Sequence, residues 1–207
     1  MTRIPGVILA GGKATRMGGG DKGLLPLGDA TLLDSVIGRL GPQCSELAIN
    51  ANGDPARFAR FGLPVLADPM ADFPGPLAGV LAGLDWAAQT GAEAIVTAAA
   101  DTPFLPGDLV ARLTAEAAEK GVPIALAASA DEAGVQRRHP TFGLWPTGLR
   151  EDLRAALSGG LRKIVLWTDR HGAATVPFPA ASFDPFFNVN TPEDMARAER
   201  LLARGMA

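Results

Sequence analysis

The sequence predicts an α/β fold: one three-layer domain spanning residues 1–207, with a mainly parallel sheet between two layers of helices. Short apolar runs alternate with amphipathic helical patterns along the chain, which is the arrangement of consecutive βαβ units. Several of these runs are apolar at every position, as strands are when helices cover both faces of the sheet. No internal repeat or low-complexity linker divides the chain, so we expect a single domain.

The first two thirds of the chain supply most of the expected elements. Apolar runs predict strands at residues 7–10, 47–51, 65–67, 94–99 and 124–128. Amphipathic stripes predict three helices: one at residues 32–40, one with its stripe at 77–84 that starts at Pro76 and is closed by Gly91, and one at 109–117 that ends at Gly121. In such sheets ligands bind beyond the carboxyl ends of the strands, so the residues that follow each strand are the candidates for chemistry.

The pattern is less regular in the last third of the chain. Residues 139–145 predict a strand, residues 149–157 a helix and residues 186–189 a short strand. The last helix has a clear start, because Thr191, Pro192 and Asp194 form a capping-box sequence.

Composition excludes several classes of protein. A net charge of −3 argues against a general surface for nucleic acid or anionic membranes. The single cysteine, Cys44, allows no internal disulfide, and the sequence has no Cys/His cluster typical of structural zinc. No apolar stretch approaches the roughly 18 residues of a membrane span, and the first run is too short for a signal peptide, so we expect a cytoplasmic protein.

The loop after the first predicted strand, residues 9–23, has the composition of a polyphosphate site. Its six glycines allow the backbone to approach a ligand closely, and Lys13, Arg16 and Lys22 would neutralise anionic charge. Two familiar motifs do not explain it. The G-x-G-x-x-G spacing at residues 18–23 lacks the strand–turn–helix context of a dinucleotide site, and no Walker A sequence is present. On composition alone, a flexible loop with solvated cations remains the alternative.

The segment LAGGKATRMGGGDKGLL at residues 9–25 resembles the opening of the molybdenum cofactor guanylyltransferases, which are nucleotidyltransferases with a Rossmann-like domain. The resemblance continues in order through residues 49–52, 68–79, 101–106, 139–141 and 187–194, and so covers nearly the whole chain. It implies transfer of GMP from GTP to the phosphate of molybdenum-molybdopterin, with Mg²⁺ as cofactor and pyrophosphate as the second product. Molybdoenzyme apoproteins or cofactor-delivery proteins are the implied protein partners.

The same resemblance implies roles for individual residues. The catalytic residues would be Arg16, Lys22 and Asp101, with Asp101 also the Mg²⁺ ligand, as suits a carboxylate after the central strand. Asn188 and Asn190 would bind the molybdopterin substrate. The nucleotide would contact a set of residues that mostly follow predicted strands: Leu9, Ala10, Gly11, Gly12, Lys22, Asn50, Asp68 and Asp101.

Each of these side chains also has an ordinary structural interpretation. Asp101, Asp68 and Asn50 lie in sequences that favour turns or helix caps, and Asn188 and Asn190 could simply lead the chain into its last helix. The two histidines, His139 and His171, are more typical of structural hydrogen bonding than of catalysis.

Three other functions are open at this point. The nearest is a relative with the same fold that uses CTP or activates a sugar phosphate, although the cytidylyl relatives usually open with Leu-Ala-Ala-Gly rather than Leu-Ala-Gly-Gly. A non-catalytic GTP-binding adaptor that delivers the cofactor is the second. A dinucleotide-dependent oxidoreductase is the third, and the failed glycine spacing weighs against it.

Overall fold

The computed structural model describes residues 4–11, 20–70, 75–131, 133–161, 163–180 and 183–205. The contacts expected of Gly12, Lys13 and Arg16 lie outside these residues. In the described part of the chain, no helix is both long and apolar enough to cross a membrane.

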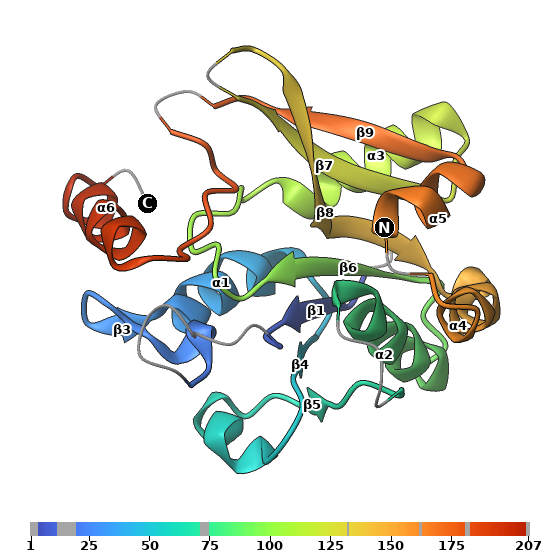
Figure 1. The fold of residues 1–207 in the computed structure, drawn as a ribbon, viewed down its shortest axis with the longest axis horizontal. Coiled ribbons are helices and arrows are strands. Elements are labelled where there is room, and N and C mark those ends of the chain that lie inside the picture. Colours follow the sequence, from blue (N-terminus) through green and yellow to red (C-terminus); the bar gives the residue numbers. More distant parts are fainter. Residues whose placement is uncertain are drawn as a thin grey trace.

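A seven-stranded sheet lies at the centre of the fold (Figure 1). Its strand order is β5-β4-β1-β6-β8-β7-β9. Only β8 runs antiparallel to its neighbours, pairing with β6 on one side and β7 on the other, so the sheet is mainly parallel. The strands are β1 (Gly6–Leu9), β4 (Leu47–Asn50), β5 (Val65–Leu66), β6 (Ala94–Ala99), β7 (Ile124–Ala130), β8 (Gln136–Pro146) and β9 (Ala173–Phe178).

Helices cover both faces of this sheet and give the expected three layers. One face carries α1 (Leu32–Leu40) and α3 (Leu109–Lys120). The other face carries α2 (Pro76–Gln89), α4 (Arg150–Ser158) and α5 (Ile164–Arg170).

A smaller unit lies at the end of the sheet toward which the arrows of β1 and β6 point (Figure 1). It consists of the hairpin β2 (Pro26–Leu27) and β3 (Ala30–Thr31) packed on α6 (Pro192–Ala203). Short 3-10 helices link the elements of the fold: η2 (Lys22–Leu24), η3 (Gly41–Gln43), η4 (Pro55–Phe61) and η5 (Thr147–Leu149).

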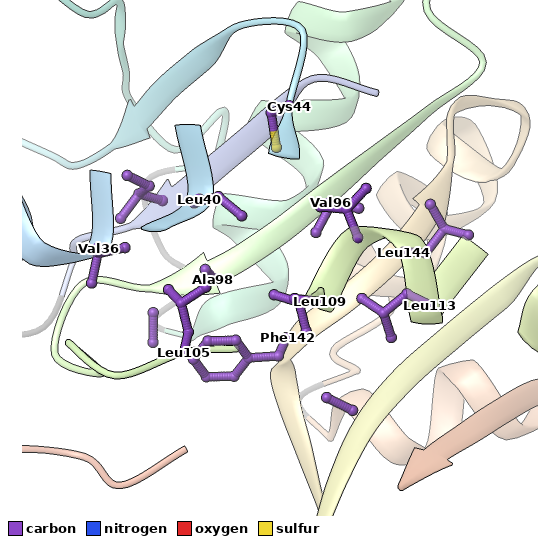
Figure 2. Close-up of a cluster of buried hydrophobic side chains, with 14 of the residues drawn as sticks. Val36, Leu40, Cys44, Val96, Ala98, Leu105, Leu109, Leu113, Phe142 and Leu144 are labelled. Atoms are coloured by element: carbon purple, nitrogen blue, oxygen red, sulfur yellow. The ribbon is translucent and has the colours of Figure 1, made fainter. Parts of the chain in front are cut away.

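The strands contribute side chains to both layers because successive residues point to opposite faces. Ile8 and Val96 belong to the core beneath α1 and α3, whereas Val7 and Ile95 belong to the core beneath α2. Figure 2 shows the first of these cores, where α1 and α3 bring their apolar stripes together beside β6. Full burial of an aliphatic side chain of this size contributes about 1.5–3 kcal/mol, so these two cores dominate the stability of the sheet.

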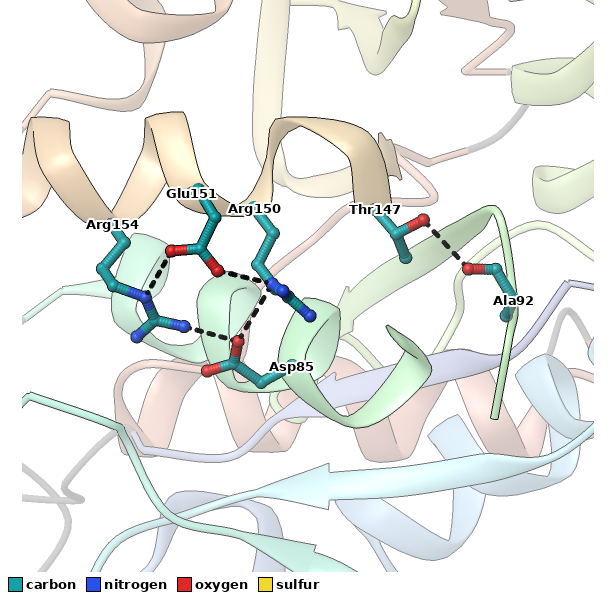
Figure 3. Close-up of polar contacts among 6 residues, drawn as sticks. All are labelled: Asp85, Ala92, Thr147, Arg150, Glu151 and Arg154. Carbon is teal, nitrogen blue, oxygen red and sulfur yellow. Dashed lines mark hydrogen bonds and ion pairs between the residues drawn. The ribbon is translucent and has the colours of Figure 1, made fainter. Parts of the chain in front are cut away.

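Charged side chains join two helices on the opposite face (Figure 3). Asp85 of α2 forms an ion pair with Arg154, whose Nη2 lies 2.6 Å from Asp85 Oδ1. Arg150 Nε lies 3.6 Å from the same oxygen. Glu151 contacts both arginines, at 2.9 and 3.2 Å. Thr147 anchors the preceding turn by donating to the carbonyl of Ala92 at 2.9 Å.

The elements predicted from the first two thirds of the sequence are confirmed to within a few residues, as are the strand at 139–145, the helix at 149–157 and the capping box of the last helix. The α/β class with a mainly parallel sheet is also confirmed. Three features were not predicted: α5, β9 and the β2–β3 hairpin.

The short strand predicted at residues 186–189 is wrong. The segment pairs with no strand, and its backbone contact with the end of the sheet is one hydrogen bond from Val189 N to the carbonyl of Asp101, at 2.9 Å. The reason is that both edges of β6 are already occupied, by β1 and β8. Phe186 instead acts as a packing group, with ring centroids 4.9 Å from Phe142 and 5.3 Å from Phe178.

Candidate active site

A pocket of about 480 Å³ opens beyond the carboxyl ends of β1, β4 and β6. These three strands run parallel and are adjacent, so the residues that follow them meet at one edge of the sheet. Ligands bind at this position in open parallel sheets. The pocket is lined by Leu9, Ala10, Gly11, Lys22, Gly23, Asn50, Asn52, Asp68, Gly75, Pro76, Ala99, Ala100, Asp101, Thr141 and Asn188.

Lys22 joins three distant parts of the chain at this pocket. Its ammonium group donates to Asp101 Oδ2 at 2.9 Å and to Asn190 Oδ1 at 2.6 Å. The side chains of Lys22 and Asp101 are 15% and 20% exposed, so the pair is largely but not fully removed from water. An ammonium has three N–H donors, and its contacts with the residues that the structure describes leave one of them for a ligand.

Close backbone packing brings Lys22 to this place. Ala100 N donates to the carbonyl of Leu9 at 3.1 Å, which continues the pairing of β1 and β6 into the loop that carries Asp101. Turn η2 lies directly on this loop, since a Cβ added at Gly23 would be 3.1 Å from Ala100 Cβ. Small residues on both sides therefore let Lys22 reach the carboxylate.

The donor set at Asp101 fits a hard divalent cation held jointly with phosphate oxygens. Its Oδ2 accepts from Lys22, whereas the described contact of Oδ1 is a long one of 3.5 Å from the Thr102 hydroxyl. That hydroxyl has a much closer acceptor, Asn188 Oδ1 at 2.5 Å. Among the described residues no three His, Cys, Asp or Glu side chains gather as a metal cage. A single carboxylate with substrate phosphates is the usual protein contribution to a Mg²⁺ site.

Asp68 forms the opposite wall of the pocket, where two carboxamides hold it. Asn50 Nδ2 donates to its Oδ1 at 2.8 Å, and Asn52 Nδ2 donates to its Oδ2 at 2.7 Å. Asn52 Oδ1 also accepts from the backbone N–H of Asp68 at 2.8 Å. The three side chains form a polar group whose orientation is fixed before any ligand arrives.

Helix α2 approaches this polar group without a side chain in between. A Cβ at Gly79 would lie 2.1 Å from Asn50 Oδ1, and one at Gly83 would lie 2.7 Å from Val7 Cγ2. The absence of a side chain at these two positions therefore permits the close packing of α2 on the sheet. Gly75, at the start of the same helix, lines the pocket.

The third wall comes from β8 and the segment before α6. Thr141 and Asn188 line the pocket there. His139, two residues before Thr141, contacts Ser129 Oγ at 2.7 Å through Nε2 and stacks on Phe186 with ring centroids 4.5 Å apart. Burial lowers the pKa of His139 below its ordinary value of 6.5, although the nearby Asp184 carboxylate partly offsets this. The neutral imidazole thus supports the segment that carries Asn188.

The structure brings most of the residues predicted as a site into one place. Leu9, Ala10, Gly11, Lys22, Asn50, Asp68, Asp101 and Asn188 line the pocket, and Asn190 joins them through Lys22. Gly12 and Arg16 lie outside the described residues. Sequence reasoning did not assign Asn52 or Thr141 to the site, yet both line it. The sequence did contain a signal for Asn52, because this second asparagine lies only two residues after Asn50, just beyond the same strand.

Comparisons with known proteins identify the family of this chain. The MobA-like NTP transferase domain matches residues 6–173. The chain is 55% identical over 204 residues to the molybdenum cofactor guanylyltransferase of Mesorhizobium japonicum, covering 96% of each chain. It is 56% identical over 203 residues to that of Rhodopseudomonas palustris, covering 97% of this chain and 94% of the relative.

A solved structure supports the fold at greater distance. Molybdopterin-guanine dinucleotide biosynthesis protein A from Archaeoglobus fulgidus superposes with a TM-score of 0.73 at 23% identity, covering 97% of this chain and 100% of that one. Because the domain match spans most of the chain and the curated relatives exceed half identity over nearly all of it, the chain belongs to the MobA-like NTP transferase family and is a nucleotidyltransferase.

Proposed function

We propose that this enzyme transfers GMP from GTP to the phosphate of molybdenum-molybdopterin, forming molybdopterin guanine dinucleotide and pyrophosphate. The names of its relatives suggest these substrates. The observation that carries the proposal is the Lys22–Asp101 pair in the pocket beyond the carboxyl ends of the parallel strands. It places a cation and a carboxylate 2.9 Å apart where a triphosphate can reach both.

The nucleotide would occupy the walls built by β1, β4 and the loop after β6. Lys22 would donate its remaining N–H to a phosphate oxygen, and the backbone of Gly11 would approach the same group. Asp68, held by Asn50 and Asn52, would face the nucleoside end. The acceptor would then lie toward Asn188 and Asn190.

The chemistry needs no covalent enzyme intermediate. A phosphate oxygen of molybdopterin attacks the α-phosphorus of GTP, the bond to the bridging oxygen of pyrophosphate breaks, and the electron pair leaves with pyrophosphate. Both reactants are anionic, so the protein must align them and offset their repulsion. Lys22 does this at the triphosphate, and the hydrogen bond from Lys22 to Asn190 connects it to the acceptor side.

Nucleotidyltransferases of this kind typically use a divalent metal, and we propose Mg²⁺ at Asp101. The cation, when bound, supplies Lewis-acid neutralisation of phosphate charge. Asp101 Oδ1 is the oxygen available to hold it, because Oδ2 is engaged by Lys22.

The direct test is a transfer assay with purified enzyme, molybdenum-molybdopterin and, in separate reactions, GTP, CTP, ATP or UTP. Pyrophosphate release and the dinucleotide product are both measured, with and without EDTA. We expect product with GTP and loss of product with EDTA. Preference for CTP would make the chain a cytidylyltransferase instead, and GTP binding without pyrophosphate release would make it an adaptor.

A further inference from the structure

Arg57 connects two walls of the pocket from a position outside them. It lies in η4, outside the pocket lining. Its Nε is 2.5 Å from Asp21 Oδ2, while Nη2 donates to the carbonyl of Asn52 and Nη1 to that of Asp54 at 2.8 Å. Nε is buried and has no aligned hydrogen bond among the described residues, so charge attraction holds the contact with Asp21.

The first of these contacts acts on the phosphate side of the pocket. Asp21 directly precedes Lys22, and the carbonyl of Asp21 accepts from Leu24 N at 3.1 Å to begin η2. Anchoring the Asp21 side chain therefore fixes the backbone from which Lys22 extends to Asp101.

The second contact acts on the nucleoside side. Asn52, whose carbonyl Arg57 holds, is the residue that binds both the carboxylate and the backbone N–H of Asp68. One guanidinium thus contacts both Asp21, which precedes Lys22, and Asn52, which binds Asp68.

The local backbone makes room for this arrangement. Gly53 has a φ of +85°, and a Cβ there would lie 3.0 Å from Arg57 Nη1, so the guanidinium lies over a residue without a side chain. The side chains of Arg57 and Asp21 are 29% and 22% exposed, which shields the pair partly from salt. The planar fork of arginine is needed, because an ammonium is a single point charge and cannot span the three acceptors.

We propose that Arg57 is a positioning residue for the nucleotide: through Asp21 and Asn52 it holds the phosphate-binding and nucleoside-binding walls in their mutual geometry before GTP enters. The inference rests on the function proposed above, because it concerns the GTP side of the same pocket. The acceptor wall, at Thr141 and Asn188, has no contact with Arg57 among the described hydrogen bonds and ion pairs. The effect of Arg57 is therefore specific to the nucleotide.

Arg60 provides a matched control on the same turn. It makes an ion pair with Asp34 at 2.5 Å, donates to Thr31 Oγ1 at 3.0 Å, and lies over the Phe61 ring at 4.2 Å. Arg57 similarly lies over Phe58, at 4.9 Å. The two arginines share their chemistry, but Arg60 contacts the start of α1 rather than the pocket.

The experiment compares Arg57→Met, Arg57→Lys, Asp21→Asn and Arg60→Met with the parent enzyme. GTP affinity is measured by calorimetry with Mg²⁺, KM is measured separately for GTP and for the acceptor, and melting temperature is recorded. We expect Arg57→Met to raise Kd and KM for GTP on the order of 10-fold and to leave the acceptor KM within about twofold. The Kd and KM for GTP of Arg57→Lys and of Asp21→Asn should lie between those of the parent and of Arg57→Met. In a double variant, Asp21→Asn should cause no further increase beyond that of Arg57→Met alone.

The contrary result is equally clear. If Arg57→Met changes GTP affinity no more than Arg60→Met does, or raises both KM values together, Arg57 is only a structural residue and the inference is wrong. If the parent enzyme binds GTP but transfers nothing, the proposed function fails, while the ratio of GTP affinities still decides the role of Arg57. If the parent binds no nucleotide, both proposals are overturned.

Discussion

Two groups of charged side chains tie distant parts of this chain together, and they differ in what lies beside them. Lys22 and Asp101 are 79 positions apart and 2.9 Å from each other; Arg154 and Asp85 are 69 positions apart and 2.6 Å from each other. The first pair lines the pocket, whereas the second bridges α2 and α4 on the outside of the sheet (Figure 3).

The geometry of an ion pair does not by itself reveal its role. Both pairs are short, and both remain partly exposed, at 15% and 20% for Lys22 and Asp101 and at 35% and 27% for Arg154 and Asp85. What separates them is position: only the first lies at the carboxyl ends of parallel strands, beside backbone that a ligand can approach. The first pair should therefore matter for turnover and the second for stability.

The largest effect is expected for Lys22→Met. This change keeps most of the length of the side chain but removes the charge at the proposed triphosphate site. We expect kcat/KM for GMP transfer to fall on the order of 10²–10³-fold, as when one preorganised contact is lost. Steady-state transfer and thermal melting together check this, since the melting temperature should change little. Near-normal transfer would place Lys22 in the same class as Arg154.

Asp101→Asn removes the charge of the carboxylate while keeping the shape of the side chain, so it tests whether that charge is needed for transfer. The amide can still accept from Lys22, but it is a poor ligand for a hard cation. We expect transfer to fall about 10²-fold and the dependence on Mg²⁺ concentration to move to much higher values. A Mg²⁺ titration of the transfer rate measures this. An unchanged titration midpoint would mean that Asp101 does not hold the metal.

His139 gives a prediction for pH rather than for turnover. Because burial lowers its pKa in the folded protein, the unfolded chain binds the proton more readily, so stability is lost as pH falls from about 6.5 toward the folded-state pKa. The melting temperature of the parent protein should drop across this range, and His139→Gln should remove that part of the drop. If the melting temperatures of the two proteins fall with pH in the same way, His139 does not contribute to the pH dependence of stability.

The smallest effect is expected for Arg154→Met on the outside of the sheet. Partly exposed ion pairs of this type contribute about 1 kcal/mol or less, and Arg150 remains near Asp85 after the change. Chemical denaturation should therefore show a slight loss of stability, and the transfer rate should equal that of the parent. A variant with reduced GMP transfer and normal stability would break the distinction between the two ion pairs.

Much of the proposed nucleotide side of the pocket could be predicted from the sequence because its residues end strands or follow them. Asn50 ends β4 and Asp101 follows β6, and both strands were expected to run parallel, so the convergence of the two residues followed from the fold class. The position of Lys22 was expected only as part of a cationic loop. Its contact with Asn190 spans 168 positions and depends on where residues 184–190 return to the sheet, which no local pattern encodes.

The proposed acceptor side was less predictable for the same reason. Phe186 and Val189 resemble strand residues in sequence, yet their place is set by the rings of Phe142 and Phe178 and by one backbone bond to Asp101. Tertiary packing decides such segments, because no free strand edge is available to them. The link from Arg57 to Asp21 and Asn52 was missed likewise, since it joins three loops rather than one motif.

A structure of the enzyme with a non-hydrolysable GTP analogue and Mg²⁺ would test most directly whether the Lys22–Asp101 pair binds the triphosphate. We predict that the triphosphate lies in the pocket beyond β1 and β6, with Lys22 Nζ at hydrogen-bond distance from a phosphate oxygen and the cation on Asp101. A nucleotide bound elsewhere, or one whose phosphates leave the Lys22–Asp101 pair untouched, would contradict it.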